Sequence, residues 1–266
     1  MPGTRVRTAQ LAAVECMVMG SGPPLVLLPG LAPENGRPSG LARNGELQTM
    51  TPYARDFTVY WIGRPTGMKR GTTFSELTAS VADAIRAEFD APVPVIGIST
   101  GGSIGLQLAA EHSELVDRLA VLSSGSRLSG HALTTQREMI RITERGNPRL
   151  VMAAFARDVV PAWRGRNLAA GSMYLLGLRL YPGARDTNDL LVTLEAEEAF
   201  DLRGLPTINA PTLIVNGGRD QFYRPDVVRE THELIPGSRL LVYPRRGHIT
   251  VVSDKTALGE VRAFLR

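Results

Sequence analysis

Short apolar runs alternate with amphipathic stretches along most of this 266-residue chain. The apolar runs are rich in aliphatic, aromatic and β-branched side chains, and several are bounded by Gly or Pro, which indicates buried strands. These predicted strands cover residues 25–28, 57–62, 93–98, 119–122, 212–215 and 239–243. Between residues 73 and 89 apolar side chains recur at three- and four-residue spacing, which predicts an amphipathic helix. Helices are also expected after Gly101, over about 225–234 and at the end of the chain.

The alternation of buried strands with helices is typical of a mostly parallel sheet that helices cover on both faces. It is interrupted between residues 125 and 205, where helical patterns appear without a comparable strand. These patterns lie around 139–142, 150–160 and 190–200. We therefore predict an α/β fold whose core is formed by residues 1–124 and 206–266, with residues 125–205 inserted as a helical lid.

Composition and charge indicate a globular protein with a substantial core, because 43% of the residues are hydrophobic and 21% are charged. The net charge of +4 is spread along the chain with both signs interspersed. Nucleic-acid-binding proteins usually concentrate Lys and Arg on one element, so we expect no nucleic-acid partner. Only Lys69 and Lys255 are lysines, and this bias towards arginine favours a bacterial chain from a GC-rich genome.

The single cysteine, Cys16, has no partner for an internal disulfide, and no Cys/His set has the spacing of a zinc site. The apolar stretch over 11–19 is short and is interrupted by Glu15, so neither a signal peptide nor a membrane span is expected. The segment Gly20-Ser21-Gly22 is followed by prolines rather than by a helix, which excludes a dinucleotide fingerprint, and no Walker or His-Glu-x-x-His motif occurs. We expect a cytoplasmic protein without cofactor, metal or membrane partner.

The strongest local motif is Gly97-Ile98-Ser99-Thr100-Gly101, which follows a predicted strand and precedes a predicted helix. A sharp strand-to-helix turn exposes its serine in a strained conformation and needs small residues on both sides. The positive end of the helix dipole also stabilises negative charge that develops near this serine. We therefore predict that Ser99 is a nucleophile.

A serine hydroxyl needs a base within hydrogen-bond reach and an acid that orients the base. In sites built on such a turn, the acid and the histidine follow the serine in chain order. Asp220 follows one late predicted strand and a glycine turn, and His248 follows the next, both at carboxyl ends of strands. We predict His248 as general base and Asp220 as the orienting acid, with Asp226 and His131 as the competing residues.

An oxyanion formed during acyl transfer needs two preorganised donors. The backbone N–H of Thr100, directly after the proposed nucleophile, is the first candidate. The second is expected from the loop after the strand 25–28, where Pro29-Gly30-Leu31 forms a turn, and we assign it to the N–H of Leu31.

With these residues identified, the chain resembles the α/β-hydrolase superfamily over nearly its whole length. The nucleophile turn, the insertion after the strand ending near Leu122 and the order of the late acid and histidine all match. Two segments differ: Pro29-Gly30 stands where the family commonly has His-Gly, and Gly63-Arg64-Pro65 stands where it commonly has Asp-x-Arg-Gly. The resemblance implies a hydrolase that acts on a small molecule without a cofactor.

We expect a serine hydrolase that cleaves a small to medium carboxylic ester, lactone or thioester through an acyl-enzyme on Ser99. The alternative is a non-hydrolytic member of the fold, either a small-ligand binding protein or a lyase or cyclase that acts on a biosynthetic intermediate. Apolar and aromatic residues of the insertion are candidates to line an acyl pocket or to pack the lid on the core. They are Met152, Phe155, Trp163, Met173, Tyr174 and Tyr181.

Overall fold

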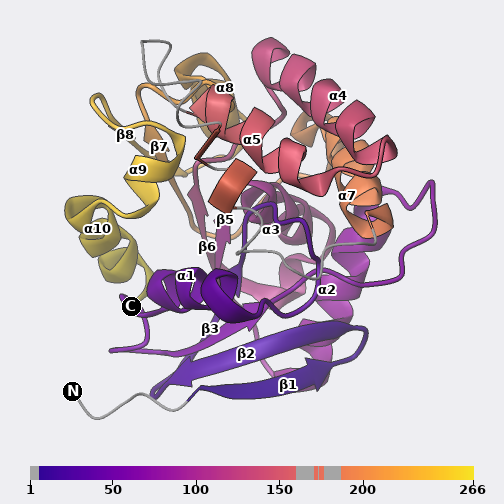
Figure 1. The fold of residues 1–266 in the computed structure, drawn as a ribbon. Coiled ribbons are helices and arrows are strands. Elements are labelled where there is room, and N and C mark those ends of the chain that lie inside the picture. Colours follow the sequence, from indigo (N-terminus) through magenta and orange to yellow (C-terminus); the bar gives the residue numbers. More distant parts are fainter. Residues whose placement is uncertain (1–5, 160–170, 173, 177–186) are drawn as a thin grey trace.

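A computed structural model describes residues 6–159, 171–172, 174–176 and 187–266. In the described chain an eight-stranded sheet runs in the order β1-β2-β4-β3-β5-β6-β7-β8 (Figure 1). Strands β3 to β8 are parallel, and β2 pairs antiparallel with β1 and β4. The strands are β1 Arg7–Leu11, β2 Val14–Gly20, β3 Pro24–Leu28, β4 Thr58–Ile62, β5 Val93–Ile98, β6 Val116–Leu122, β7 Thr212–Gly217 and β8 Arg239–Tyr243.

The predicted fold class is confirmed: a mostly parallel sheet lies between helices on both faces. Each apolar run identified in the sequence forms a strand of this sheet. The reason is burial, since β3 and β7 are buried along nearly their whole length. A strand covered on both faces carries a continuous apolar run rather than an alternating one.

The hairpin of β1 and β2 was not predicted. Its register pairs Leu11 with Val14, so the turn consists of two alanines, of which Ala12 has a positive φ of 48°. Two-residue hairpin turns normally carry Asn-Gly or another Gly-containing pair, because positive φ is costly for other residues. An Ala-Ala turn therefore gives no hairpin pattern in the sequence.

Two hydrophobic cores lie on opposite faces of the sheet. Successive side chains of a strand point to opposite faces, so Val26 and Leu28 enter the core on one face while Leu25 and Leu27 enter the core on the other. The first core contains residues of α2 Phe74–Glu88, α3 Thr100–Glu111 and α8 Pro225–Leu234. The second contains residues of α1 Gly40–Met50, α9 His248–Val252 and α10 Lys255–Leu265. None of the helices described is long and apolar enough to cross a membrane.

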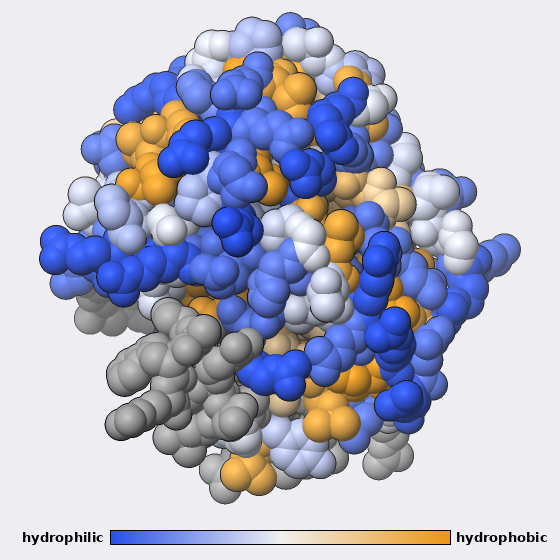
Figure 2. Space-filling model, turned by 90° about the horizontal axis from the view of Figure 1, so that it is seen from above, coloured by the Kyte–Doolittle hydropathy of each residue, from blue (hydrophilic) through white to orange (hydrophobic). Residues whose placement is uncertain are grey.

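The chain between β6 and β7 contributes helices above the carboxyl ends of the strands (Figure 1). In the described part of residues 125–205 the regular elements are α4 Gly130–Glu144, α5 Pro148–Val159, α7 Asn188–Glu198 and the short 3-10 helix η2 Leu202–Gly204. Buried residues of α4, α5 and α7 join the first core, among them Met139, Val151 and Leu190. Seen from above, this face is mostly hydrophilic, with hydrophobic side chains in separate groups (Figure 2).

Cys16 provides a test of this arrangement. Its side chain is fully buried in β2, and burial, reinforced by the negative charge of Glu88, raises the pKa of the thiol to about 12. Since only the thiolate reacts readily, we expect Ellman's reagent at pH 8 to leave Cys16 unmodified in the folded protein. In about 6 M guanidinium chloride, a strongly denaturing concentration, the same reagent is expected to titrate one thiol per chain. Rapid titration of the native protein would show that β2 is misplaced.

Candidate active site

Ser99 joins the end of β5 to the start of α3, with backbone φ of 53° and ψ of −123°. A positive φ is uncommon outside glycine and marks stored strain at functional positions. The flanking glycines are needed because the backbone is crowded. A Cβ on Gly97 would lie 2.3 Å from the carbonyl oxygen of Gly101, and one on Gly101 would lie 2.2 Å from that of Leu28. The G-x-S-x-G pattern is therefore a steric requirement of this turn.

The three side chains predicted to act together are in hydrogen-bond contact. His248 Nε2 lies 3.1 Å from Ser99 Oγ, and His248 Nδ1 lies 2.9 Å from Asp220 Oδ2. Both His248 and Asp220 are buried. Asp220 comes from the turn after β7, and His248 is the first residue of α9. The arrangement can pass the proton of the serine hydroxyl to an imidazole that a buried carboxylate orients.

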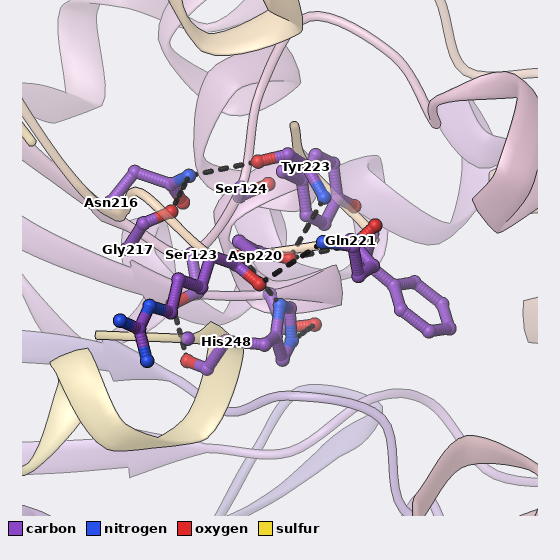
Figure 3. A network of polar contacts seen from close by, with 12 residues as sticks. Ser123, Ser124, Asn216, Gly217, Asp220, Gln221, Tyr223 and His248 are labelled. Atoms are coloured by element: carbon purple, nitrogen blue, oxygen red, sulfur yellow. Dashed lines mark hydrogen bonds and ion pairs between the residues drawn. The ribbon is translucent and has the colours of Figure 1, made fainter. Parts of the chain in front are cut away.

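The surroundings of Asp220 and His248 fix both groups (Figure 3). Asp220 Oδ1 accepts hydrogen bonds from the backbone N–H groups of Phe222 at 2.9 Å and Tyr223 at 3.1 Å, which leaves Oδ2 directed at the histidine. Ser123 Oγ donates to the carbonyl oxygen of His248 at 2.7 Å. The rings of Phe155, Phe222 and Tyr223 pack around the imidazole, and that of Tyr223 is stacked on it. These contacts restrict rotation of the histidine.

The competing residues lie elsewhere. Asp226 is exposed and pairs with Arg224, with Oδ1 3.4 Å from Nε. His131 Nε2 lies 3.1 Å from Asp158 Oδ2. Within the described ranges no three His, Cys, Asp or Glu side chains are grouped so that they could hold a metal ion.

The two predicted oxyanion donors come from different segments: Thr100 is the first residue of α3, directly after Ser99, and Leu31 follows β3. In the part of the chain that the structure describes, neither backbone N–H donates a hydrogen bond. Both donors are therefore available to an oxygen that develops negative charge beside Ser99.

Sequence reasoning missed the residue that holds the Leu31 turn. The side chain of Arg64 is buried, and its Nη1 donates to the carbonyl oxygens of Pro29 at 3.4 Å and Gly30 at 3.0 Å. Its Nε donates to Asn35 Oδ1 at 2.9 Å. A guanidinium carries several donors in a rigid plane, so Arg64 fixes the carbonyls that precede the Leu31 N–H. The departure at Gly63-Arg64-Pro65 thus still supplies an arginine for this turn.

A second missed residue is Glu197 of α7, whose side chain is buried next to the turn at Ser99. It accepts hydrogen bonds from Thr100 Oγ1 at 2.9 Å, Ser103 Oγ at 3.2 Å and the Tyr223 hydroxyl at 3.2 Å. Burial raises the pKa of Glu197, although these hydrogen bonds and the charge of Arg64 act in the opposite direction. The sequence holds a trace of this placement, because Glu197 lies three residues after Leu194 on a helix, at the spacing of one face.

A cavity of about 540 Å³ opens at Ser99 and His248. It extends between α1 and the pair α9 and α10, and its lining is mainly apolar. Of the insertion residues considered as pocket candidates, Phe155 lines this cavity. Trp163, Met173 and Tyr181 lie outside the described residues.

Known proteins resemble this chain in sequence and in fold. A family model described as alpha/beta hydrolase fold matches residues 23–254. The chain is 30% identical over 198 residues to a pimeloyl-[acyl-carrier protein] methyl ester esterase of Neisseria meningitidis serogroup B / serotype 15, covering 68% of this chain and 71% of the relative.

Two solved structures share the fold. The first is MGS-M2, an alpha/beta hydrolase enzyme from a Medee basin deep-sea metagenome library, with a TM-score of 0.75 and 19% identity over 98% of this chain and 96% of that one. The second is an esterase from Exiguobacterium antarcticum, with a TM-score of 0.72 and 20% identity over 95% and 96% of the two chains. At these identities the likeness concerns the fold.

Glu197 yields a prediction about stability and pH. Because its pKa is higher in the folded than in the unfolded chain, ionising it costs folding free energy as the pH rises through the folded-state pKa. Below the unfolded-state value both states are protonated and the cost disappears. We therefore expect Glu197→Gln to melt above the wild type at pH 8, with a difference that shrinks towards pH 4. For a domain of this size each 1 kcal/mol corresponds to about 2–4 °C.

The matched control is Glu195→Gln on the same helix, where a partly exposed carboxylate pairs with Arg70. Exposed pairs contribute little to stability, so its melting temperature is expected to change by less than about 2 °C. A gain in Glu197→Gln that grows towards acid pH would contradict the assigned direction of the pKa.

Proposed function

The chain belongs to the alpha/beta hydrolase family, and we propose that it is a serine hydrolase that cleaves a small to medium carboxylic ester, lactone or thioester. The observation that carries this proposal is the hydrogen-bonded chain from Ser99 through His248 to Asp220 at the edge of a cavity. The Neisseria relative is named as a methyl ester esterase, which supports ester cleavage.

In the first half-reaction His248 Nε2 takes the proton of Ser99 while Oγ attacks the carbonyl carbon of the substrate. The carbonyl electron pair moves to oxygen, and the N–H groups of Leu31 and Thr100 stabilise the oxyanion. The intermediate then collapses: the bond to the leaving group breaks, and His248 returns the proton to the departing oxygen or sulfur. The acyl group remains as an ester on Ser99.

In the second half-reaction water takes the place of the leaving group. His248 removes a proton from the water, the hydroxide attacks the acyl carbon, and a second oxyanion forms between Leu31 and Thr100. Collapse breaks the bond to Ser99 Oγ, which recovers its proton from His248, and the carboxylic acid leaves. Asp220 stabilises the imidazolium in both halves through its Oδ2.

The alternatives use less of this arrangement. A protein that only binds a ligand needs no strained serine in line with an imidazole and a carboxylate. A lyase or cyclase that only moves protons needs the base, but not a nucleophile 3.1 Å from it. The N–H groups of Leu31 and Thr100 suit a reaction in which a carbonyl oxygen gains charge. Acyl transfer uses all of these features.

We place the reaction in the cytoplasm of a bacterium. The relatives found are bacterial, from Neisseria among others. Cys16 is the single cysteine of the chain, and its free thiol is buried, which suits a reducing compartment.

Ser99→Ala is expected to lower kcat/KM for p-nitrophenyl acetate by at least about 10³-fold, because the acyl-enzyme can no longer form. A fluorophosphonate probe should modify Ser99 of the wild type, as located by peptide mass spectrometry. The control is Ser80→Ala on α2, whose hydroxyl donates to the backbone carbonyl oxygen of Glu76. Wild-type activity in the Ser99 variant, or an unlabelled Ser99 in folded wild type, would refute the proposed chemistry.

Asp220→Asn separates the two acids considered from the sequence. The amide cannot stabilise the imidazolium and favours the wrong histidine tautomer, so kcat is expected to fall by about 10³–10⁴-fold with a small change in KM. Asp226→Asn is the matched control and is expected to stay within about 2-fold of the wild type, since its exposed ion pair contributes little. Steady-state kinetics on both variants decides between them, and a larger loss in the Asp226 variant would reverse the assignment.

A further inference from the structure

Two cavities of very different size meet at Ser99. The large one measures about 540 Å³, within the range of ligand pockets. The small one measures about 10 Å³, which is room for about one water molecule. Leu31, Ser99 and Phe155 line both, so a substrate carbonyl at Ser99 would extend one substituent into each.

The position of His248 decides which substituent goes where. The general base must also protonate the leaving group, so the leaving oxygen has to lie within hydrogen-bond reach of Nε2. His248 lines the large cavity, together with Ile249 and Val252 of the same helix. The described residues that line the small cavity include Thr100, Met139 and Glu197 but not His248. The leaving alcohol is therefore directed into the large cavity, and the acyl substituent into the small one.

The walls of the two cavities also favour a short acyl group and a larger alcohol. Leu128, Met139, Phe222 and Tyr223, which enclose the small cavity, are all buried, so little can move aside for a longer acyl chain. The large cavity includes exposed residues of α1 and α9, among them Gly45 and Ile249, and thus reaches the surface. A bulky alcohol can extend outwards, whereas a long acyl chain meets these buried side chains.

Resting on the proposed function, we propose that this enzyme is selective for esters that join a short acyl group to a larger, mainly apolar alcohol. The methyl of an acetyl group fills the small cavity, and the alkyl or aryl part of the alcohol fills the space between α1, α9 and α10. This specificity is the reverse of that of a methyl ester esterase acting on a long acyl chain.

The test uses two isomeric substrates with the same atoms, hexyl acetate and methyl heptanoate. They differ only in which side of the carboxyl group carries the long chain. Because one methylene that does not fit changes specificity by about 10-fold or more, kcat/KM is expected to be at least about 10-fold higher for hexyl acetate. The ratio is measured on one protein sample, so the folded fraction cancels.

Gly45→Phe is designed to narrow the large cavity. A Cβ at Gly45 meets nothing within 4 Å, so a side chain can be added without a clash. We expect the ratio of kcat/KM for hexyl acetate to kcat/KM for ethyl acetate to fall by about 10-fold. Gly259→Phe on α10 is the control, because its Cβ also meets nothing within 4 Å and it does not line the cavity. It should leave both substrates unchanged.

Met139→Ala enlarges the small cavity and is expected to raise the methyl heptanoate to hexyl acetate ratio by about 10-fold. Equal or better cleavage of methyl heptanoate by the wild type would overturn the assignment while ester hydrolysis stands. Failure to cleave either isomer by protein that a fluorophosphonate labels at Ser99 would overturn the assignment alone. Failure to cleave together with an unlabelled Ser99 would overturn the proposed function as well.

Discussion

The hydrogen bond between His248 and Ser99 joins residues 149 positions apart in the chain, and the site exists only because the sheet brings them together. Strands β5, β6, β7 and β8 are parallel neighbours, so their carboxyl ends share one edge. Ser99, Ser123 and Asp220 follow the first three of these strands, and His248 follows the last. The hydrogen bond from Ser123 Oγ to the carbonyl oxygen of His248 links the segment after β6 to the start of α9 at that edge.

The main features of the fold and the three side chains of the site could be predicted because their patterns are local. A buried parallel strand is a short apolar run, and the turn around Ser99 must carry glycine at positions 97 and 101 since any Cβ would meet backbone. The acid and the histidine lie in the turns after two such apolar runs, although β8 itself is only partly buried. Proximity in space then follows from the direction of the strands, without knowledge of any other contact.

Other features could not be predicted, because they arise where separate elements meet. The β1–β2 hairpin has an Ala-Ala turn without the usual residues. Arg64 acts on carbonyls more than thirty residues earlier in the chain, and Glu197 contacts Thr100 and Tyr223 from α7. The sizes of the two cavities likewise depend on side chains from many elements. No local pattern encodes such contacts.

Arg64 and Glu197 have opposite electrostatic effects on the site of the proposed oxyanion donors. The guanidinium lies behind the Leu31 turn, where a fixed positive charge favours a developing oxyanion. The carboxyl of Glu197 is bonded to the side chain of Thr100, where a negative charge would oppose it. Burial raises the pKa of Glu197 and so shifts it towards its uncharged form. Glu197 can therefore hold Thr100 and Tyr223 in place through hydrogen bonds. Because burial makes its carboxyl costly to ionise, it opposes negative charge on the oxyanion less than an ionised carboxylate would.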